Sequence, residues 1–423
     1  MKKLALFTLA ASMFSAFTLK AQDEEPKGKL TVSGYVDMYY QYNMNNPAFA
    51  ENLSVVPGGL PSGQNPGRIF DIKHNQFSLG LVQTKFAYAT DRSEVVIDLT
   101  YGPNAALGNF GNLFGTDINI KQAYMAYNAT DKLTFTVGQF GTHIGYELID
   151  APLNYNYSLS YLFGNGPFYH TGAKAAYMFS DKVGLMAGIV NGWDGMYDFN
   201  KKKSAIAQLY LAPKDGWDVY INYVGGDERN GLSFPTIGGP TALGYTPIGT
   251  GDSIKTPSHL FDLTTTYQVN DAFKIGLNAA YGSGKLLQDA TDPNKYNSAT
   301  WYGAALYLNY AFSDVFGLGL RAEHFNDADG VRYVTGAIAA GSMGGVKGVV
   351  VNEFTLTGDI KLKDGHFNLK PEFRIDLATP QFVDGATDAQ KEFKGYNKFK
   401  GDGTFDKTVG AQATIGMAAI YSF

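Results

Sequence analysis

Apolar and polar residues alternate along much of this chain, and no other feature of the sequence limits its fold so strongly. Between Phe367 and Leu377 the apolar residues fall at odd positions, and asparagine, lysine, glutamate, arginine and aspartate fall at even positions. Successive side chains of a β-strand point to opposite faces, so this segment predicts a strand with one apolar and one charged face. The alternation recurs in the segments 94–101, 217–223, 261–268, 273–281 and 316–323.

Two kinds of all-β fold fit this pattern: a soluble sandwich and a transmembrane barrel. The alternating segments run about ten residues or more, which a tilted strand needs to cross a bilayer, whereas strands of soluble sheets most often have about five or six residues. Tyrosines also cluster near segment ends, as expected at the membrane surface: Tyr39, Tyr40, Tyr42, Tyr124, Tyr127, Tyr307 and Tyr310. Both observations favour the barrel, and the soluble sandwich remains the alternative.

The connections between the segments alternate between short and long. Seven are tight turns rich in Asp, Asn and Gly, which tolerate the backbone of a hairpin: 90–92, 130–132, 180–182, 213–216, 270–271, 313–314 and 363–365. Eight are long: 43–72, 103–116, 141–166, 194–202, 227–257, 283–298, 327–348 and 378–407. Fifteen connections predict a transmembrane antiparallel β-barrel of about 16 strands, with short periplasmic turns and long extracellular loops.

Both ends of the chain agree with export to an outer membrane. Residues 1–21 have a basic start, a short apolar run and a small residue at the end, which predicts a cleaved signal peptide rather than a membrane anchor. Residues 22–29 then form a short N-terminal segment, and 30–423 the barrel domain. The last strand ends in Phe423, which resembles the C-terminal signal read by the barrel-assembly machinery. We expect lipopolysaccharide and the lipid bilayer around the barrel.

Composition excludes several other classes. Cysteine is absent, so there is no disulfide framework and no Cys-ligated metal. The net charge of −5 argues against a nucleic-acid partner, which usually binds a basic surface. The six histidines are scattered, and neither a metal-ligand spacing nor a nucleophile motif accompanies them. We therefore predict no enzymatic activity, no catalytic residues, no metal site and no cofactor.

A barrel of about sixteen strands is wide enough to leave an aqueous channel. The strand phases place equal numbers of basic and acidic residues on the inner wall, among them Lys85, Lys121, Arg321, Glu323, Lys370, Glu372 and Arg374. Because neither sign dominates, we expect weak ion selectivity. We also expect each of these charges to be a solvated residue of the pore wall.

The long segment 141–166, the third of the long loops, has an unusual composition. It is rich in aliphatic and aromatic residues and carries only two acids, Glu147 and Asp150. A loop surrounded by bulk water has no need of so many apolar side chains. The composition therefore indicates a loop that packs against the inner wall of the barrel.

Three motifs carry a family resemblance: Val137-Gly-Gln-Phe-Gly-Thr-His-Ile-Gly-Tyr-Glu147, the stretch 162–172, and Val190-Asn-Gly-Trp-Asp194. They resemble the putative β-barrel porin-2, OmpL-like family. The resemblance implies a Gram-negative outer-membrane porin. The chain also resembles general sixteen-stranded porins, whose third loop folds inward with acids that face basic wall residues. The strand count makes Lys85, Lys121 and Arg321 the candidates for those basic residues. We therefore expect a pore constriction formed by His143, Tyr146, Glu147, Asp150, Tyr155 and Tyr157.

The expected function is passive diffusion of small hydrophilic solutes through a water-filled channel that this loop narrows. The main alternative is a non-conducting barrel that serves as an adhesin or an envelope scaffold. The apolar exterior is also compatible with a homotrimer, although lipid-facing and subunit-facing strands have the same pattern in a single sequence.

Overall fold

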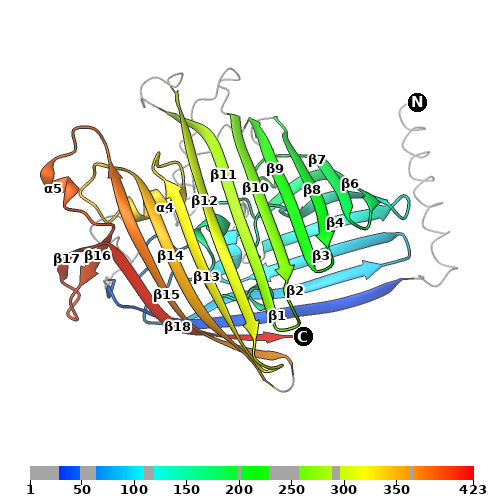
Figure 1. The fold of residues 1–423 in the computed structure, drawn as a ribbon, viewed down its shortest axis with the longest axis horizontal. Coiled ribbons are helices and arrows are strands. Elements are labelled where there is room, and N and C mark those ends of the chain that lie inside the picture. The colour runs from blue at the N-terminus through cyan, green and yellow to red at the C-terminus, as the bar shows by residue number, and fades with distance from the viewer. Residues whose placement is uncertain are drawn as a thin grey trace, which may run out of the picture.

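The structure, a computed structural model, describes residues 28–47, 63–108, 119–198, 202–227, 257–287, 296–362 and 365–423. The predicted signal peptide, 1–21, and most of the segment 22–29 lie outside the described residues. Sixteen antiparallel strands form one closed barrel in which β1 pairs with both β2 and β18. The all-β barrel and its sixteen strands, predicted from the spacing of the turns, are therefore confirmed (Figure 1).

The strands differ in length around the barrel, and those from β10 to β15 are mostly longer than those from β3 to β8. The barrel strands are β1 (Lys29–Asn43), β2 (Phe77–Ala89), β3 (Ser93–Tyr101), β4 (Asn119–Asn128), β5 (Leu133–Gly141), β6 (Tyr169–Ser180), β7 (Val183–Val190), β8 (Ser204–Lys214), β9 (Trp217–Asp227), β10 (Pro257–Gln268), β11 (Phe273–Leu287), β12 (Tyr296–Ala311), β13 (Phe316–Asp327), β14 (Val346–Lys361), β15 (Phe367–Phe382) and β18 (Ala411–Ser422). Short helical segments lie in the long connections: α2 (Pro103–Gly108), η1 (Ala151–Leu153), α3 (Tyr161–Gly164), α4 (Tyr333–Ala339) and α5 (Asp388–Lys391).

The last long connection differs from the irregular loop predicted at 378–407. It contains α5 and a two-stranded ribbon, β16 (Tyr396–Phe399) and β17 (Phe405–Val409). Asp402 explains the turn between them, because its carboxylate accepts hydrogen bonds from both the backbone and the hydroxyl of Thr404. Figure 1 shows α5 and this ribbon beyond one end of the barrel wall and the C-terminus at the other end.

The two faces of the wall follow the alternation in the sequence. Along β13, every second residue from Gly317 to Asp327 is buried inside the barrel, and Leu320 faces outward. In β18, Ile415, Met417 and Tyr421 are exposed on the outer face, as is Phe423 just beyond it. The backbone of Phe423 exchanges hydrogen bonds with that of Gly34, next to the seam between the first and last strands.

The predicted tyrosine clusters are divided between the two faces. Tyr310 is 43% exposed, whereas Tyr307 is buried inside the barrel, as is Tyr39. Residues three apart on a strand lie on opposite faces, so only one of such a pair can face the lipid. Tyr124 likewise packs against the inner apolar cluster. The prediction of a membrane-surface position is therefore wrong for Tyr39, Tyr124 and Tyr307.

The lumen is not an open tube. At its loop end, α3 and α4 pack with inward side chains such as Trp301, Phe325 and Val351 in one apolar cluster. The first loop also enters, because the buried Arg68 bonds Asp376 of β15. Packed loops thus replace water in this part of the barrel.

No helix among the residues described is long and apolar enough to span a membrane.

Candidate pore constriction

The third loop, which the structure places at residues 142–168, crosses the inside of the barrel between β5 and β6. Its two ends meet where the backbone N–H of Thr142 donates to the carbonyl of Phe168 at 3.1 Å. Between these points the loop contacts wall strands on both sides of the lumen. The predicted inward packing is thus the conformation that the structure shows.

Glu147 of the loop binds Arg321 of β13. The Arg321 Nη1 to Glu147 Oε1 distance is 2.5 Å, and the same guanidinium bonds Glu353 and the carbonyl of Ser158. The side chain of Arg321 is 0% exposed. A buried charge is tolerated only when opposite charges and hydrogen bonds surround it, as they do here.

Asp150 binds the wall at a different place. Its carboxylate lies 2.5 Å from Lys121 Nζ of β4 and accepts a 3.0 Å hydrogen bond from the amide of Gln83. Nearby, the hydroxyl of Tyr157 donates to Asp37 of β1 at 2.6 Å. The loop is therefore attached to the wall at β1, β2 and β4 as well as at β13.

The backbone of the loop also binds wall charges. Glu372 accepts hydrogen bonds from the N–H groups of Tyr157 and Ser158, at 2.8 and 3.1 Å. Glu323 accepts from the N–H groups of Tyr161 and Leu162, both at 2.7 Å, at the start of α3. Free N–H groups at a helix start attract a carboxylate, so Glu323 caps this short turn from the wall.

Two wall cations bind loop carbonyls in the same way. Lys370 donates to Asn154 O and Tyr155 O, and Arg374 donates to Leu159 O at 2.7 Å. The expectation that these wall charges are solvated is wrong for Arg321, Glu323, Lys370, Glu372 and Arg374, all of which are buried. The reason is that the loop supplies polar backbone groups where water was expected.

The opposite side of the loop, residues 143–145, is held more lightly. His143 Nε2 lies 3.0 Å from the carbonyl of Tyr223, so this nitrogen carries the hydrogen. Burial lowers the pKa of His143 to about 4, which keeps the ring neutral at pH 7. The N–H of Gly145 donates to Asp262 of β10 at 3.1 Å.

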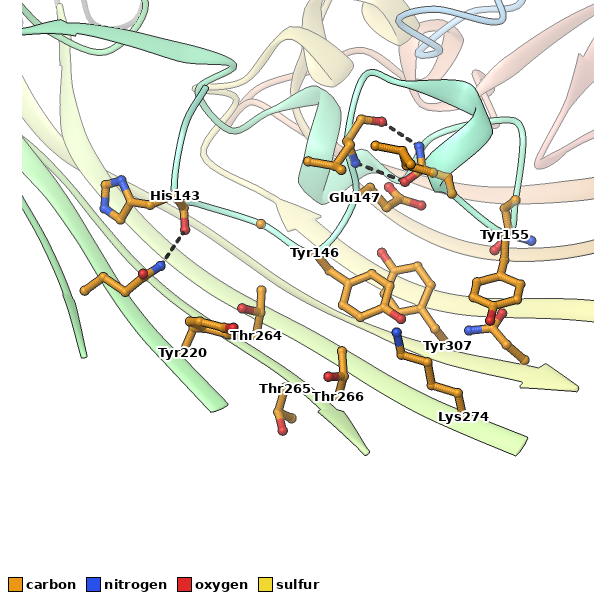
Figure 2. Close-up of a pocket in the computed structure, with 17 residues that line it drawn as sticks. His143, Tyr146, Glu147, Tyr155, Tyr220, Thr264, Thr265, Thr266, Lys274 and Tyr307 are labelled. Carbon is orange, nitrogen blue, oxygen red and sulfur yellow. Dashed lines mark hydrogen bonds between the residues drawn. The ribbon is translucent and has the colours of Figure 1, made fainter. Parts of the chain in front are cut away.

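A cavity of about 290 Å³ lies between this part of the loop and strands β8 to β12 (Figure 2). Its lining is mainly aromatic, hydroxyl and amide: His143, Gly145, Tyr146, Glu147, Leu148, Leu153, Asn154, Tyr155, Asn156, Gln208, Tyr220, Thr264, Thr265, Thr266, Lys274, Tyr307 and Asn309. A second cavity of only about 10 Å³ adjoins Gly145 and Asp262. Gly145 thus borders both cavities.

Two wall glycines make room for tyrosines of the loop. The ring of Tyr146 lies against Gly276 of β11, where a Cβ would stand 2.5 Å from ring atoms. Tyr155 lies against Gly319 of β13 in the same manner, 3.0 Å from such a Cβ. Tyr146 also stacks on Tyr307, with ring centroids 4.2 Å apart.

The predicted constriction residues are divided between the two sides of the loop. Figure 2 shows His143, Tyr146, Glu147 and Tyr155 at the cavity, whereas Asp150 and Tyr157 bind the wall at β1 to β4. Of the candidate basic partners, Arg321 binds Glu147 and Lys121 binds Asp150.

Lys85 forms no ion pair with the loop among the described residues. Sequence reasoning missed Tyr220, Thr264, Tyr307 and Asn309 of the cavity. The alternation of side chains along β9 to β12 could have identified them, because it places these residues on the inner face. No cluster of His, Cys, Asp and Glu suited to a metal occurs in the described part of the chain.

A closed sixteen-strand barrel with a loop folded into its lumen is the architecture of outer-membrane porins, and solved porins match it. OmpT of Vibrio cholerae is 12% identical with a TM-score of 0.52, covering 95% of this chain and 99% of its own. The channel DcaP of Acinetobacter baumannii is 11% identical with a TM-score of 0.53, at the same coverage. An anion-selective porin from Comamonas acidovorans is 10% identical with a TM-score of 0.51, covering 94% and 100%. These identities establish the fold alone.

The family follows from the sequence. Residues 29–423 match the model described as "Putative beta-barrel porin-2, OmpL-like", so the chain belongs to this family of outer-membrane β-barrel porins and not to an enzyme family. No curated protein sequence matches the chain. The resemblance seen in the three motifs is confirmed.

Proposed function

We propose that the protein is an outer-membrane channel for passive diffusion of small hydrophilic solutes. The observation that carries this proposal is the cavity of about 290 Å³ on the lightly held side of the third loop. Its lining is polar but mostly uncharged, so it suits hydrated, neutral solutes. The solute path runs between residues 143–147 and the wall formed by β8 to β12.

Gly145 borders this path. A Cβ at this residue would meet no atom within 4 Å, and its backbone lies in the left-handed region at φ +89°. A glycine here adds no side chain to the path and allows the loop to turn. Here the loop backbone borders the path and is held by the hydrogen bond from Gly145 to Asp262.

Selectivity among ions is weak in this proposal. Of the two charged residues that line the cavity, Glu147 is paired with Arg321, and Lys274 belongs to no ion pair among the described residues. A strongly selective pore needs a ring of one sign, which this lining does not provide.

The remaining steps of biogenesis belong to the same proposal. Residues 1–21 direct export from the cytoplasm of a Gram-negative bacterium and are removed, Phe423 is recognised by the barrel-assembly machinery, and lipopolysaccharide surrounds the outer leaflet. A solved form of the Vibrio cholerae OmpT is a trimer. For this chain we propose a homotrimer, supported by the apolar exterior of the barrel.

The structure also favours a second candidate, a non-conducting barrel that acts as an adhesin or scaffold. The supporting observation is the buried network of Arg321, Arg374, Glu323 and Glu372, which ties the third loop across the lumen. A loop held this firmly closes much of the cross-section.

Planar-bilayer recording of the refolded protein separates these candidates. Stable open steps in 1 M KCl are expected for the channel, together with solute-dependent swelling of liposomes. Electrical silence from protein with the heat-modifiable mobility of a folded barrel would instead support the scaffold.

A further inference from the structure

The cavity beneath the third loop has more of the features of a binding site than of a plain water passage. Tyr146 and Tyr307 stack on each other, and Tyr155 and Tyr220 stand at other sides of the same space (Figure 2). Phenol rings offer apolar faces together with hydroxyl groups. Small-molecule sites combine such rings with a few polar groups that orient the ligand.

Several polar groups at this cavity are buried without a partner. Asn309 of β12 is 1% exposed, and neither its amide nitrogen nor its amide oxygen forms a hydrogen bond. The phenol of Tyr146 interacts electrostatically with this amide, although no hydrogen bond of normal geometry joins the two side chains. The carbonyl oxygen of Asn156 is also buried and unpartnered.

Unpartnered groups of this kind are uncommon, because leaving a buried donor or acceptor unsatisfied costs about 1–3 kcal/mol. They include both a donor, the amide nitrogen of Asn309, and acceptors, the amide oxygens of Asn309 and Asn156. A hydroxyl group can donate and accept at the same time, so hydroxyl-bearing ligands match this mixture best.

Charge narrows the class of ligand further. Glu147 is already bound by Arg321 and by the N–H of Ser160 at 2.7 Å, which leaves Lys274 as the one charged side chain of the lining without an ion pair among the described residues. Lys274 projects toward the stacked tyrosines but lies among uncharged groups (Figure 2). An uncharged ligand can contact all of these groups without the free-energy cost of removing water from a charge.

We propose that this cavity is a binding site for an uncharged, polyhydroxylated ring solute of hexose size. Its volume of about 290 Å³ is close to the lower limit of the range of about 300–1,000 Å³ that is typical of small-molecule sites. This volume fits a single sugar ring better than an oligosaccharide. The sugar ring packs on the partly exposed rings of Tyr146 and Tyr155, and its hydroxyls bond Asn309 and Asn156. The inference rests on the proposed channel, because a solute reaches the site through the lumen.

Titration calorimetry of the refolded, full-length barrel in detergent, with D-glucose as the probe, tests this site. We expect saturable binding with a millimolar Kd, and binding of sodium D-gluconate at least fivefold weaker. Absence of glucose binding would overturn the proposal, as would tighter binding of gluconate, because the ligand class would then be anionic and Lys274 would be its anchor.

Two matched variants locate the site. Asn309→Leu keeps the size of the side chain but removes its polar atoms, and should weaken glucose binding at least fivefold. Asn368→Leu is the control, because the Asn368 carbonyl oxygen is also buried and unpartnered but does not line the cavity. Equal affinities of the wild type and Asn309→Leu would place glucose elsewhere and overturn the assignment.

Bilayer recording of the same samples separates this inference from the proposed function. If both are correct, glucose reduces the open-channel current with the half-saturation found by calorimetry. Glucose binding without any conductance would refute the channel and leave the binding site standing. Conductance without glucose binding would refute the site and leave the channel standing.

Discussion

The third loop has two different sides, and the contrast between them explains the interior of this barrel. Toward β13 to β15 and β1 to β4, it is bound by the buried charges of Arg321 and Glu372 and by the half-buried Lys121. Toward β8 to β12, it makes lighter contacts through His143 and Gly145 and leaves the cavity open. The charged wall therefore anchors the loop, and the largely neutral wall leaves room for a solute.

Deleting residues 146–162 should change conductance more than any other variant, because it removes both sides of the third loop from the lumen. We expect single-channel conductance to rise severalfold in planar bilayers. Water can solvate Arg321 and Glu323 once the loop is gone, so the barrel should still fold. Shortening the β16–β17 ribbon is the control, and an equal conductance of the wild type and the loop deletion would place the loop outside the current path.

Arg321→Met weakens only the charged contacts that hold the third loop against β13. It leaves Glu147 buried without its cation and Glu353 with only Arg374, at 3.5 Å. Breaking a buried pair in this way costs about 3–5 kcal/mol. We expect a lower midpoint of urea unfolding and noisy, fluctuating open-channel currents. Arg321→Lys should recover part of both. A quiet channel of normal stability in Arg321→Met would show that other bonds suffice to hold the loop.

Gly276→Ala tests the packing of Tyr146 against the wall of the cavity. The added methyl group would lie 2.5 Å from the ring, so the tyrosine must shift off its stack with Tyr307. We expect conductance to change by about twofold or less, with little change in unfolding midpoint. Gly336→Ala is the control, since a Cβ there meets no atom within 4 Å. Identical currents of the wild type and Gly276→Ala would mean that Tyr146 does not border the path.

Acid should weaken the light contact at His143. The ring stays neutral in the docked loop, where its pKa is about 4, but becomes protonated below about pH 6.5 when the loop is released to water. The free loop therefore binds more protons between pH 6.5 and 4, and docking loses stability as pH falls through this window. We expect open-channel fluctuations to increase from pH 7 to pH 5, and His143→Gln to remove that increase. A pH response that persists in His143→Gln would assign it to another group.

Lys274→Met should change stability and conductance least, and it tests whether a charge on the cavity wall helps to hold the loop. Because Lys274 belongs to no ion pair among the described residues, its loss should leave the unfolding midpoint unchanged. The reversal potential in a KCl gradient should shift slightly toward cations. A clear loss of stability would contradict the view that charges on this wall have no anchoring role.

Sequence reasoning reached the barrel, its strand number and the inward loop, but it described the lumen incorrectly. The inward phase of Arg321 and Arg374 was evident, yet solvent was expected around them. Their partners in the third loop, Glu147 and the carbonyls of Ser158 and Leu159, lie more than 160 residues away in the chain. Asn309 and Tyr307 were missed because nothing local distinguishes them from other inward residues.

The sequence by itself determined the strands, their two faces, the sixteen-strand count and the position of the unusual loop, because period two and turn chemistry are local properties of the chain. Only the tertiary structure decided where the loop lies in the lumen, which wall charges hold it and where the cavity remains. Those outcomes depend on closure of β1 onto β18, which brings residues from opposite ends of the chain into one ring.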